Sequence, residues 1–328
     1  MTYYNPEITN KFLQNEKEKA DIKSYGVIAG ILIIIYVVLQ NALSVVCLID
    51  PFRTLYYTSD LIYYAFISIL SLASIALPAL FAAKYLNEKK QVNCCLFDMP
   101  RDIDKACYLI CFGFLLCLAG NYATSYFCAF IESFGFKLDY PELEFPASLA
   151  GRLVYLFSVA FVPPLCEELL CRGVVLQPLR KYGDWFAIIM SSYVFALLHG
   201  NLVQAPFAFI AGIGLGYAAC KTNTIWVPII IHFINNFYSV MVEIIVADIP
   251  EGTTQDSVYY ISLIALVLIC TVGSVFYFKD KNNDRLYSPV SDLSTSRKTL
   301  SYIFNLPMIA AIIIMLFITT ETVSFVGA

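Results

Sequence analysis

Three charged residues lie inside the apolar run FVPPLCEELLCRG, which extends from residue 161 to residue 173. They are Glu167, Glu168 and Arg172. A charged side chain at the depth of a bilayer core costs several kcal/mol, so such residues usually have a function there. Residues four apart share a helix face, so Glu168 and Arg172 should pair, whereas Glu167 points about 100° away from Glu168. An unpaired carboxylate can act as a general base, and a purely structural ion cluster is the alternative.

Two further polar groups follow on apolar segments, and they contain both histidines of the chain. One is FALLH, which ends at His199, and the other is HFINN, in which His232 and Asn236 are four residues apart. The midpoint between Glu167 and His199 falls at residue 183, within the turn sequence KYGD. Two antiparallel helices joined at this turn would carry Glu167 and His199 at equal height. His232 and Asn236 share a helix face, and a hydrogen bond between helices would explain them equally well.

The elements that must position these residues are membrane helices. Hydrophobic residues make up 59% of the 328 residues and charged residues 14%, whereas about a quarter of a soluble domain is charged. Apolar stretches long enough to cross a hydrocarbon core of about 30 Å recur along the chain. They cover approximately 25–49, 61–83, 106–131, 149–178, 185–200, 203–220, 224–246, 258–278 and 302–326. We therefore predict an all-α, polytopic transmembrane bundle of eight or nine spans, with a core of four helices around the polar groups.

The positions of these helices divide the chain into three parts. Residues 1–146 are expected to form a cytosolic segment and three spans, 147–246 the four-helix core, and 247–328 one or two spans with a basic cytosolic loop. Lys and Arg accumulate in cytosolic loops. With a cytosolic N-terminus, 17 of the 21 Lys and Arg residues face the cytosol, three face outward, and Arg172 is buried. We expect a multi-pass membrane protein in this orientation, without a cleaved signal peptide.

Other residue patterns argue against several classes of protein. The 11 cysteines lie mostly in apolar stretches and lack CxxC metal spacing, so neither a disulfide framework nor a cysteine metal site is expected. Gly212 and Gly216 form a GxxxG pair, which within a span indicates close helix packing rather than a phosphate loop. No motif for nucleic-acid binding is visible. A transporter could also carry buried Glu, Arg and His, but the inverted repeats typical of transporters are not visible between the two halves.

The three polar groups, taken in order, resemble the CPBP family of intramembrane proteases, also called the Abi or CAAX-protease family. The resemblance covers roughly residues 150–246. It rests on the patterns EExxxR (Glu167, Glu168, Arg172), FxxxH (Phe195, His199) and HxxxN (His232, Asn236). It implies a bacterial cell-membrane endopeptidase in which Glu167, helped by His199, activates water to attack a peptide carbonyl.

The resemblance also implies roles for the remaining residues. His232 and Asn236 would donate hydrogen bonds to the oxyanion that forms during attack. Glu168 and Arg172 would support the architecture, and Phe195 would pack against the site.

Cofactor and partners follow from the same resemblance. Family members have been described as metalloproteases, and Glu167, His199 and His232 with one water would make an acceptable tetrahedral zinc set. The HExxH pattern is absent, and we favour a metal-free mechanism, with zinc as the alternative. The expected partners are membrane lipids and a membrane-associated peptide or protein substrate, lipidated in some relatives, and no nucleic acid. The alternative function is a non-catalytic membrane immunity or scaffold protein that retains the fold.

Overall fold

The computed structural model describes residues 6–140, 145–250, 252–280, 285–289, 291 and 293–326, and only the backbone of residues 6–9. Lys281 is one of the 17 Lys and Arg residues expected on the cytosolic side, and it lies outside the described residues. In chain order the elements are α1 (Pro6–Ser44), η1 (Val45–Leu48), α2 (Phe52–Thr58), α3 (Asp60–Ser71), η2 (Leu72–Ala76), α4 (Leu77–Lys90), α5 (Ile103–Glu132), β1 (Phe136–Leu138), α6 (Leu149–Leu156), η3 (Phe157–Phe161), α7 (Val162–Glu168), η4 (Leu169–Val175), α8 (Leu176–Leu179), η5 (Arg180–Tyr182), α9 (Asp184–His199), α10 (Ala205–Thr222), α11 (Trp226–Val246), α12 (Thr253–Lys279), α13 (Thr295–Ile303), α14 (Leu306–Glu321) and β2 (Val323–Phe325).

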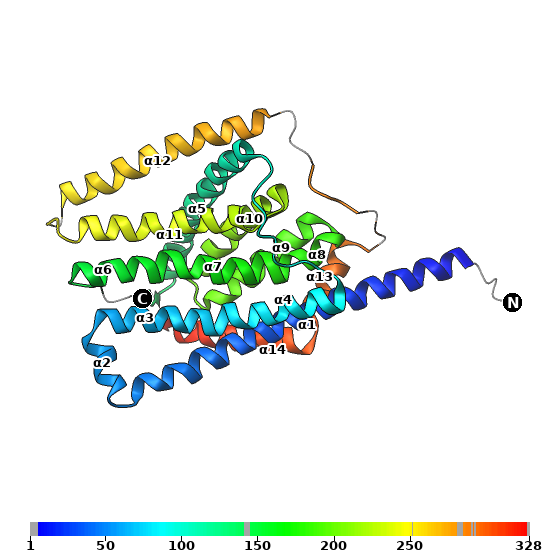
Figure 1. The fold of residues 1–328 in the computed structure, drawn as a ribbon, viewed down its shortest axis with the longest axis horizontal. Coiled ribbons are helices and arrows are strands. Elements are labelled where there is room, and N and C mark those ends of the chain that lie inside the picture. The colour runs from blue at the N-terminus through cyan, green and yellow to red at the C-terminus, as the bar shows by residue number, and fades with distance from the viewer. Residues whose placement is uncertain are drawn as a thin grey trace.

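The long helices form a bundle, as the sequence predicts. In Figure 1, α12 lies along one side and α1 and α14 along the other, and the segment from α6 to α7 runs between them. Helix α10 packs against α9 and α5, and α11 packs against α5 and η3. The strands β1 and β2 pair antiparallel and are a small addition to the all-helical prediction. The many apolar helices make the chain an integral, multi-pass membrane protein.

The prediction of eight or nine spans is not confirmed. Within the described residues, six helices are long and apolar enough to cross a membrane, and a bent pair raises the count to seven. That pair is α13 and α14, which meet at 77°, and the predicted ninth span at 302–326 covers α14 but only the last two residues of α13. Helix α9 has 16 residues and α10 has 18, and neither is among the six. By length and composition, α9 and α10, two of the four core helices, are therefore not candidate spans.

Helix α1 begins earlier than hydropathy predicts. The helix starts at Pro6 and continues through the charged segment without a break, so that its N-terminal part projects beyond the bundle (Figure 1). Further along, its glycines lie against the bend between α13 and α14. A Cβ atom at Gly30 would stand 2.4 Å from the amide nitrogen of Met308. Because this is much closer than any van der Waals contact, only glycine permits the crossing.

The fourth predicted span is one helix from Leu149 to Tyr182 that changes its winding twice. The turns η3 and η4 are π-helical, and Pro163 and Pro164 lie in the first turn of α7, just after η3. Proline has no amide hydrogen, so two consecutive backbone donors are missing at this point. Such π-helical turns inside α-helices often occur at functional sites.

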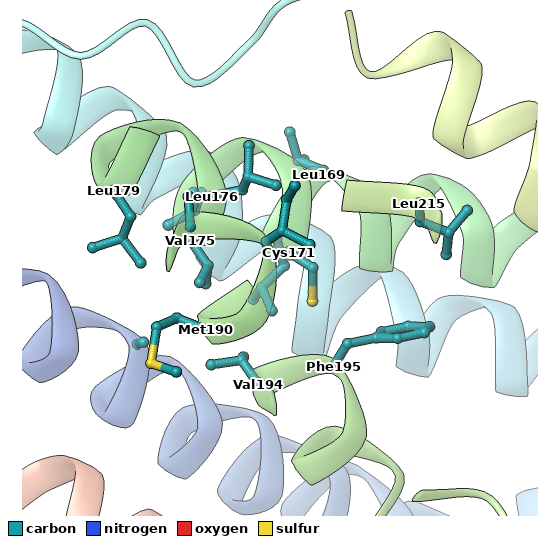
Figure 2. Close-up of a cluster of buried hydrophobic side chains, with 14 of the residues drawn as sticks. Leu169, Cys171, Val175, Leu176, Leu179, Met190, Val194, Phe195 and Leu215 are labelled. Atoms are coloured by element: carbon teal, nitrogen blue, oxygen red, sulfur yellow. The ribbon is translucent and has the colours of Figure 1, made fainter. Parts of the chain in front are cut away.

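The apolar core continues from this helix into α9. Figure 2 shows Leu169, Cys171, Val175 and Leu176 beside Met190, Val194 and Phe195, and all of these side chains are buried. Helix α10 approaches the other face of α9 closely, since a Cβ atom at Gly212 would lie 3.0 Å from the Cα atom of Ser192. The close packing that the GxxxG pair predicts is present.

Candidate active site

The polar groups that the sequence singles out surround one cavity. Its volume is about 410 Å³, and we call it the Glu167 cavity. The predicted side chains that line it come from three helices: Glu167 from α7, His199 from the end of α9, and His232 and Asn236 from α11. The full lining is Tyr36, Ile75, Tyr155, Val159, Pro163, Glu167, Leu198, His199, Gln204, Phe207, His232, Asn236, Ser239, Val240 and Glu243. The four candidate catalytic residues are therefore brought together.

Glu168 and Arg172 lie behind the cavity and are fully buried. Arg172 Nη1 donates a hydrogen bond to Glu168 Oε1 at 2.9 Å, and Nη2 donates to the carbonyl oxygen of Gly212 at 3.1 Å. The guanidinium also lies over the ring of Phe195, 4.6 Å from its centre. The ring of His232 completes the group, since its Nδ1 atom is 3.0 Å from Glu168 Oε1. We call Glu168, Arg172, His232 and the Gly212 carbonyl the buried network.

Glu167 lies on another side of the helix from Glu168, as the helical geometry predicts. Its side chain is 17% exposed, whereas that of Glu168 is 0% exposed. Among the described residues, Glu167 Oε2 has no hydrogen-bond partner, and the nearest cationic candidate is His232 Nε2 at 4.0 Å. A buried carboxylate oxygen without a donor is costly, so it is available to a water molecule or a substrate group.

The two histidines are held by different partners. His199 Nδ1 lies 2.8 Å from the carbonyl oxygen of Phe195, which can only accept, so Nδ1 carries the hydrogen. The neutral ring then presents a lone pair at Nε2. His199 is the last residue of α9, because Gly200 has a φ of 61° and ends the helix there. His232 Nδ1 faces the carboxylate of Glu168, so this nitrogen also donates.

Asn236 is positioned by a backbone carbonyl that the two prolines leave free. Its Nδ2 atom donates to the carbonyl oxygen of Val159 at 3.1 Å. An α-helix would satisfy this oxygen from residue 163, and a π-helix would satisfy it from residue 164. Because both residues are proline, neither can donate. The second hydrogen of the Asn236 amide is left for another acceptor.

Sequence reasoning missed part of the cavity lining. Tyr155 is buried, and its hydroxyl donates a hydrogen bond to Glu243 Oε2 at 2.6 Å. A signal for Glu243 was available, since His232, Asn236 and Glu243 follow helical spacing along one face of α11. Tyr36 comes from α1, which no motif connects to the site.

The zinc set that the sequence allows is not assembled. Within the part of the chain that the structure describes, no three His, Cys, Asp or Glu side chains are arranged to hold a metal ion. Glu167, His199 and His232 share the cavity, and His232 Nε2 lies 4.0 Å from Glu167 Oε2, somewhat further than the roughly 3.3 Å that separates two ligand atoms of a tetrahedral zinc ion.

The segment that carries this site is similar to known membrane proteases. A family model described as type II CAAX prenyl endopeptidase Rce1-like matches residues 149–238. The membrane-embedded CAAX protease MroQ of Staphylococcus aureus (strain USA300) is 28% identical over 131 residues, which are 37% of this chain and 53% of MroQ. The putative membrane peptidase YdiL of Bacillus subtilis (strain 168) is 28% identical over 86 residues, 26% of this chain and 35% of YdiL.

The matched regions are shorter than the relatives themselves. The chain spans about half the length of MroQ and about a third of YdiL in these alignments. No solved structure matches significantly. The matched segment nevertheless contains all four candidate catalytic residues, Glu167, His199, His232 and Asn236. Residues 149–238, which carry these four side chains, therefore resemble the Rce1-like CAAX proteases.

Proposed function

We propose that this protein is an intramembrane endopeptidase in which Glu167 activates a water molecule. The observation that carries this proposal is the Glu167 cavity, where four polar side chains from three helices of an Rce1-like segment meet. The substrate is a peptide or protein at the membrane, and a lipid-modified one is compatible with a site inside a helical bundle. The cytosolic N-terminus remains a prediction from the distribution of Lys and Arg.

Attack on the peptide bond begins with proton transfer to Glu167. Its Oε2 atom has no donor among the described residues, so it can accept a proton from water. His199 Nε2, the ring nitrogen with the lone pair, accepts a hydrogen bond from the second hydrogen of the same water. This hydrogen bond orients the water molecule, and its hydrogen stays on the water oxygen. The water oxygen bonds to the carbonyl carbon, and the carbonyl electrons move to oxygen. Glu167 then returns the proton to the leaving amine as the C–N bond breaks.

The oxyanion is stabilised by Asn236 and His232. Asn236 offers the amide hydrogen that Val159 does not use. His232 already donates from Nδ1 to Glu168, so donation from Nε2 requires the imidazolium. In this state Glu167, Glu168, Arg172 and His232 sum to zero charge, which favours their common burial. Preorganised donors of this kind contribute about 10²–10³ in rate each.

The test is cleavage of a peptide library by detergent-purified protein. Wild type is compared with Glu167→Gln and His199→Ala, and Glu321→Gln is the matched control, because Glu321 does not line the cavity. We expect cleavage by wild type and the control, and losses of at least about 10³ in the other two. Activity should survive treatment with a chelator. Loss with the chelator and rescue by zinc alone would show that the mechanism is metal-dependent.

Two outcomes would overturn the proposal. Cleavage that persists in folded Glu167→Gln contradicts the role of this carboxylate. A cellular phenotype that persists in Glu167→Gln, together with no cleavage by wild type, favours the non-catalytic binding protein.

A further inference from the structure

A second carboxylate lines the Glu167 cavity and has no cation beside it. Glu243 is partly buried on α11, and Tyr155 on α6 holds its Oε2 atom at 2.6 Å. The residues that line the cavity include neither Lys nor Arg. Arg152, one turn before Tyr155, is engaged elsewhere, since it donates two hydrogen bonds to Asp248 at 2.6 and 2.8 Å. Among the described residues, Glu243 therefore forms no ion pair with a Lys or Arg side chain.

The position of Glu243 along α11 sets its distance from the reacting carbonyl. It follows Asn236 by seven residues, which corresponds to about 10 Å along the helix axis. An extended peptide advances about 3.3 Å per residue. A substrate lying along α11, with its reacting carbonyl at Asn236, would therefore place a side chain about three residues away beside Glu243.

We propose that Glu243, oriented by Tyr155, is a subsite for a cationic group of the substrate about three residues from the cleaved bond. This inference rests on the proposed function. A Lys or Arg side chain, or the ammonium of an N-terminus, would form an ion pair with the partly buried carboxylate and donate hydrogen bonds to its remaining lone pairs. An acidic group at the same position would face the carboxylate of Glu243 and is rejected. Glu243 is a specificity residue, and Tyr155 is a positioning residue.

Binding tests the subsite independently of cleavage. The probes are fluorescein-labelled, N-acetylated apolar decapeptides that differ only in one central Lys, Gln or Glu. Fluorescence anisotropy in detergent measures their Kd for Glu167→Gln, for Glu167→Gln/Glu243→Gln and for the matched control Glu167→Gln/Glu321→Gln. We expect the Lys peptide to bind about fivefold more tightly than the Gln peptide, as for a partly buried ion pair of about 1 kcal/mol.

The preference should disappear when Glu243 is neutralised and persist in the Glu321 control. Adding Glu243→Lys to the Glu167→Gln background should reverse the order, with the Glu peptide bound best. Adding Tyr155→Phe should weaken the preference for Lys without abolishing binding. A preference that is equal with and without Glu243 overturns the subsite. The reversal by Glu243→Lys decides the matter if Glu243→Gln folds poorly.

Cleavage mapping then locates the subsite and separates the two proposals. Wild type is given peptides in which Lys moves through every position, and mass spectrometry identifies the bond that is cut. Cuts about three residues from Lys support the subsite, and cuts at no fixed distance contradict it. Peptides with a free and an acetylated N-terminus distinguish a side chain from an N-terminal ammonium. A charge preference in binding without any cleavage would leave the subsite standing and overturn the peptidase. Cleavage without a charge preference would leave the peptidase standing and overturn the subsite.

Discussion

Glu167 and Glu168 are neighbours in sequence but lie in opposite surroundings. Glu168 is fully buried, and Arg172 and His232 both donate to its Oε1 atom. The Oε2 atoms of both carboxylates lack a hydrogen-bond partner among the described residues, but only Glu167 lines the cavity, where a water molecule or a substrate group can reach it. The same chemical group is thus a structural anion on one side of the helix and an available base on the other. Substitutions in the buried network should therefore affect stability, whereas substitutions at the cavity should affect activity.

The largest effect is expected in the buried network. Arg172→Met would leave the carboxylate of Glu168 buried without its guanidinium partner, which typically costs about 3–5 kcal/mol. Thermal unfolding in detergent should show a large decrease in the unfolding temperature. The double variant Glu168→Leu/Arg172→Met should be less destabilised than Arg172→Met alone, because no unpaired charge remains. An unchanged unfolding temperature in Arg172→Met would contradict the structural role of this pair.

On the cavity side, Asn236→Ala should affect rate rather than fold. Loss of one oxyanion donor lowers kcat by about 10²–10³. The matched control is Ser239→Ala, a residue on the same helix that lines the same cavity. Steady-state cleavage kinetics and an unfolding curve measure both properties on one sample. A large decrease in stability with little change in kcat would reverse the assignment of Asn236 to the cavity side.

A smaller loss of activity is expected when the missing backbone donors are restored. In Pro163→Ala/Pro164→Ala, an amide hydrogen can reach the Val159 carbonyl and compete with Asn236. One hydrogen bond contributes about 1 kcal/mol, so we expect kcat to decrease by about fivefold to tenfold. KM should change little, since the prolines position a catalytic side chain. Equal kcat values for wild type and the double variant would show that Asn236 does not depend on this carbonyl.

The smallest effect is expected at an exposed ion pair, which contrasts with the buried one. The guanidinium of Arg152 donates to Asp248 and holds the pKa of this carboxyl below its usual range. A group whose pKa is lowered by folding stabilises the protein above its unfolded pKa of about 3.9 and loses this contribution as pH falls. Asp248→Asn should therefore lower the unfolding temperature slightly at pH 7. The difference should disappear as pH falls below about 4. If Asp248→Asn lowered the unfolding temperature more than Arg172→Met does, the exposed ion pair would contribute more to stability than the buried one, contrary to this expectation.

Helix periodicity predicted the division between the two glutamates, and the structure forms the expected ion pair of Glu168 and Arg172. Hydropathy predicted the helical bundle. It missed the bend between α13 and α14, although a local helix-start signal lies there, since the side chain of Asn305 caps α14 and Pro307 follows in its first turn. The contacts of this bend with Gly26 and Gly30 of α1 join residues far apart in the chain, and no local pattern encodes them.

The sequence predicted only part of the site, because spacing within one helix can be read from the sequence but contacts between helices cannot. Spacing along α11 places His232 and Asn236 on one face, and Glu243 continues that face. The contact between His232 and Glu168 crosses from α11 to α7 and has no local signal. The same holds for the hydrogen bond of Asn236 to Val159, which depends on how the helix winds before the prolines.

Pro163 and Pro164 make the site depend on two hydrogen atoms that the chain lacks. Almost any other amino acid at either position would bring a backbone amide into a place where none is present, whatever its side chain. Pro163 lines the Glu167 cavity and Pro164 is buried, so the size of the new side chain also matters, but every replacement shares this change in the main chain. A screen of single substitutions should therefore find residues 163 and 164 sensitive even to alanine, which adds the amide hydrogen without adding bulk.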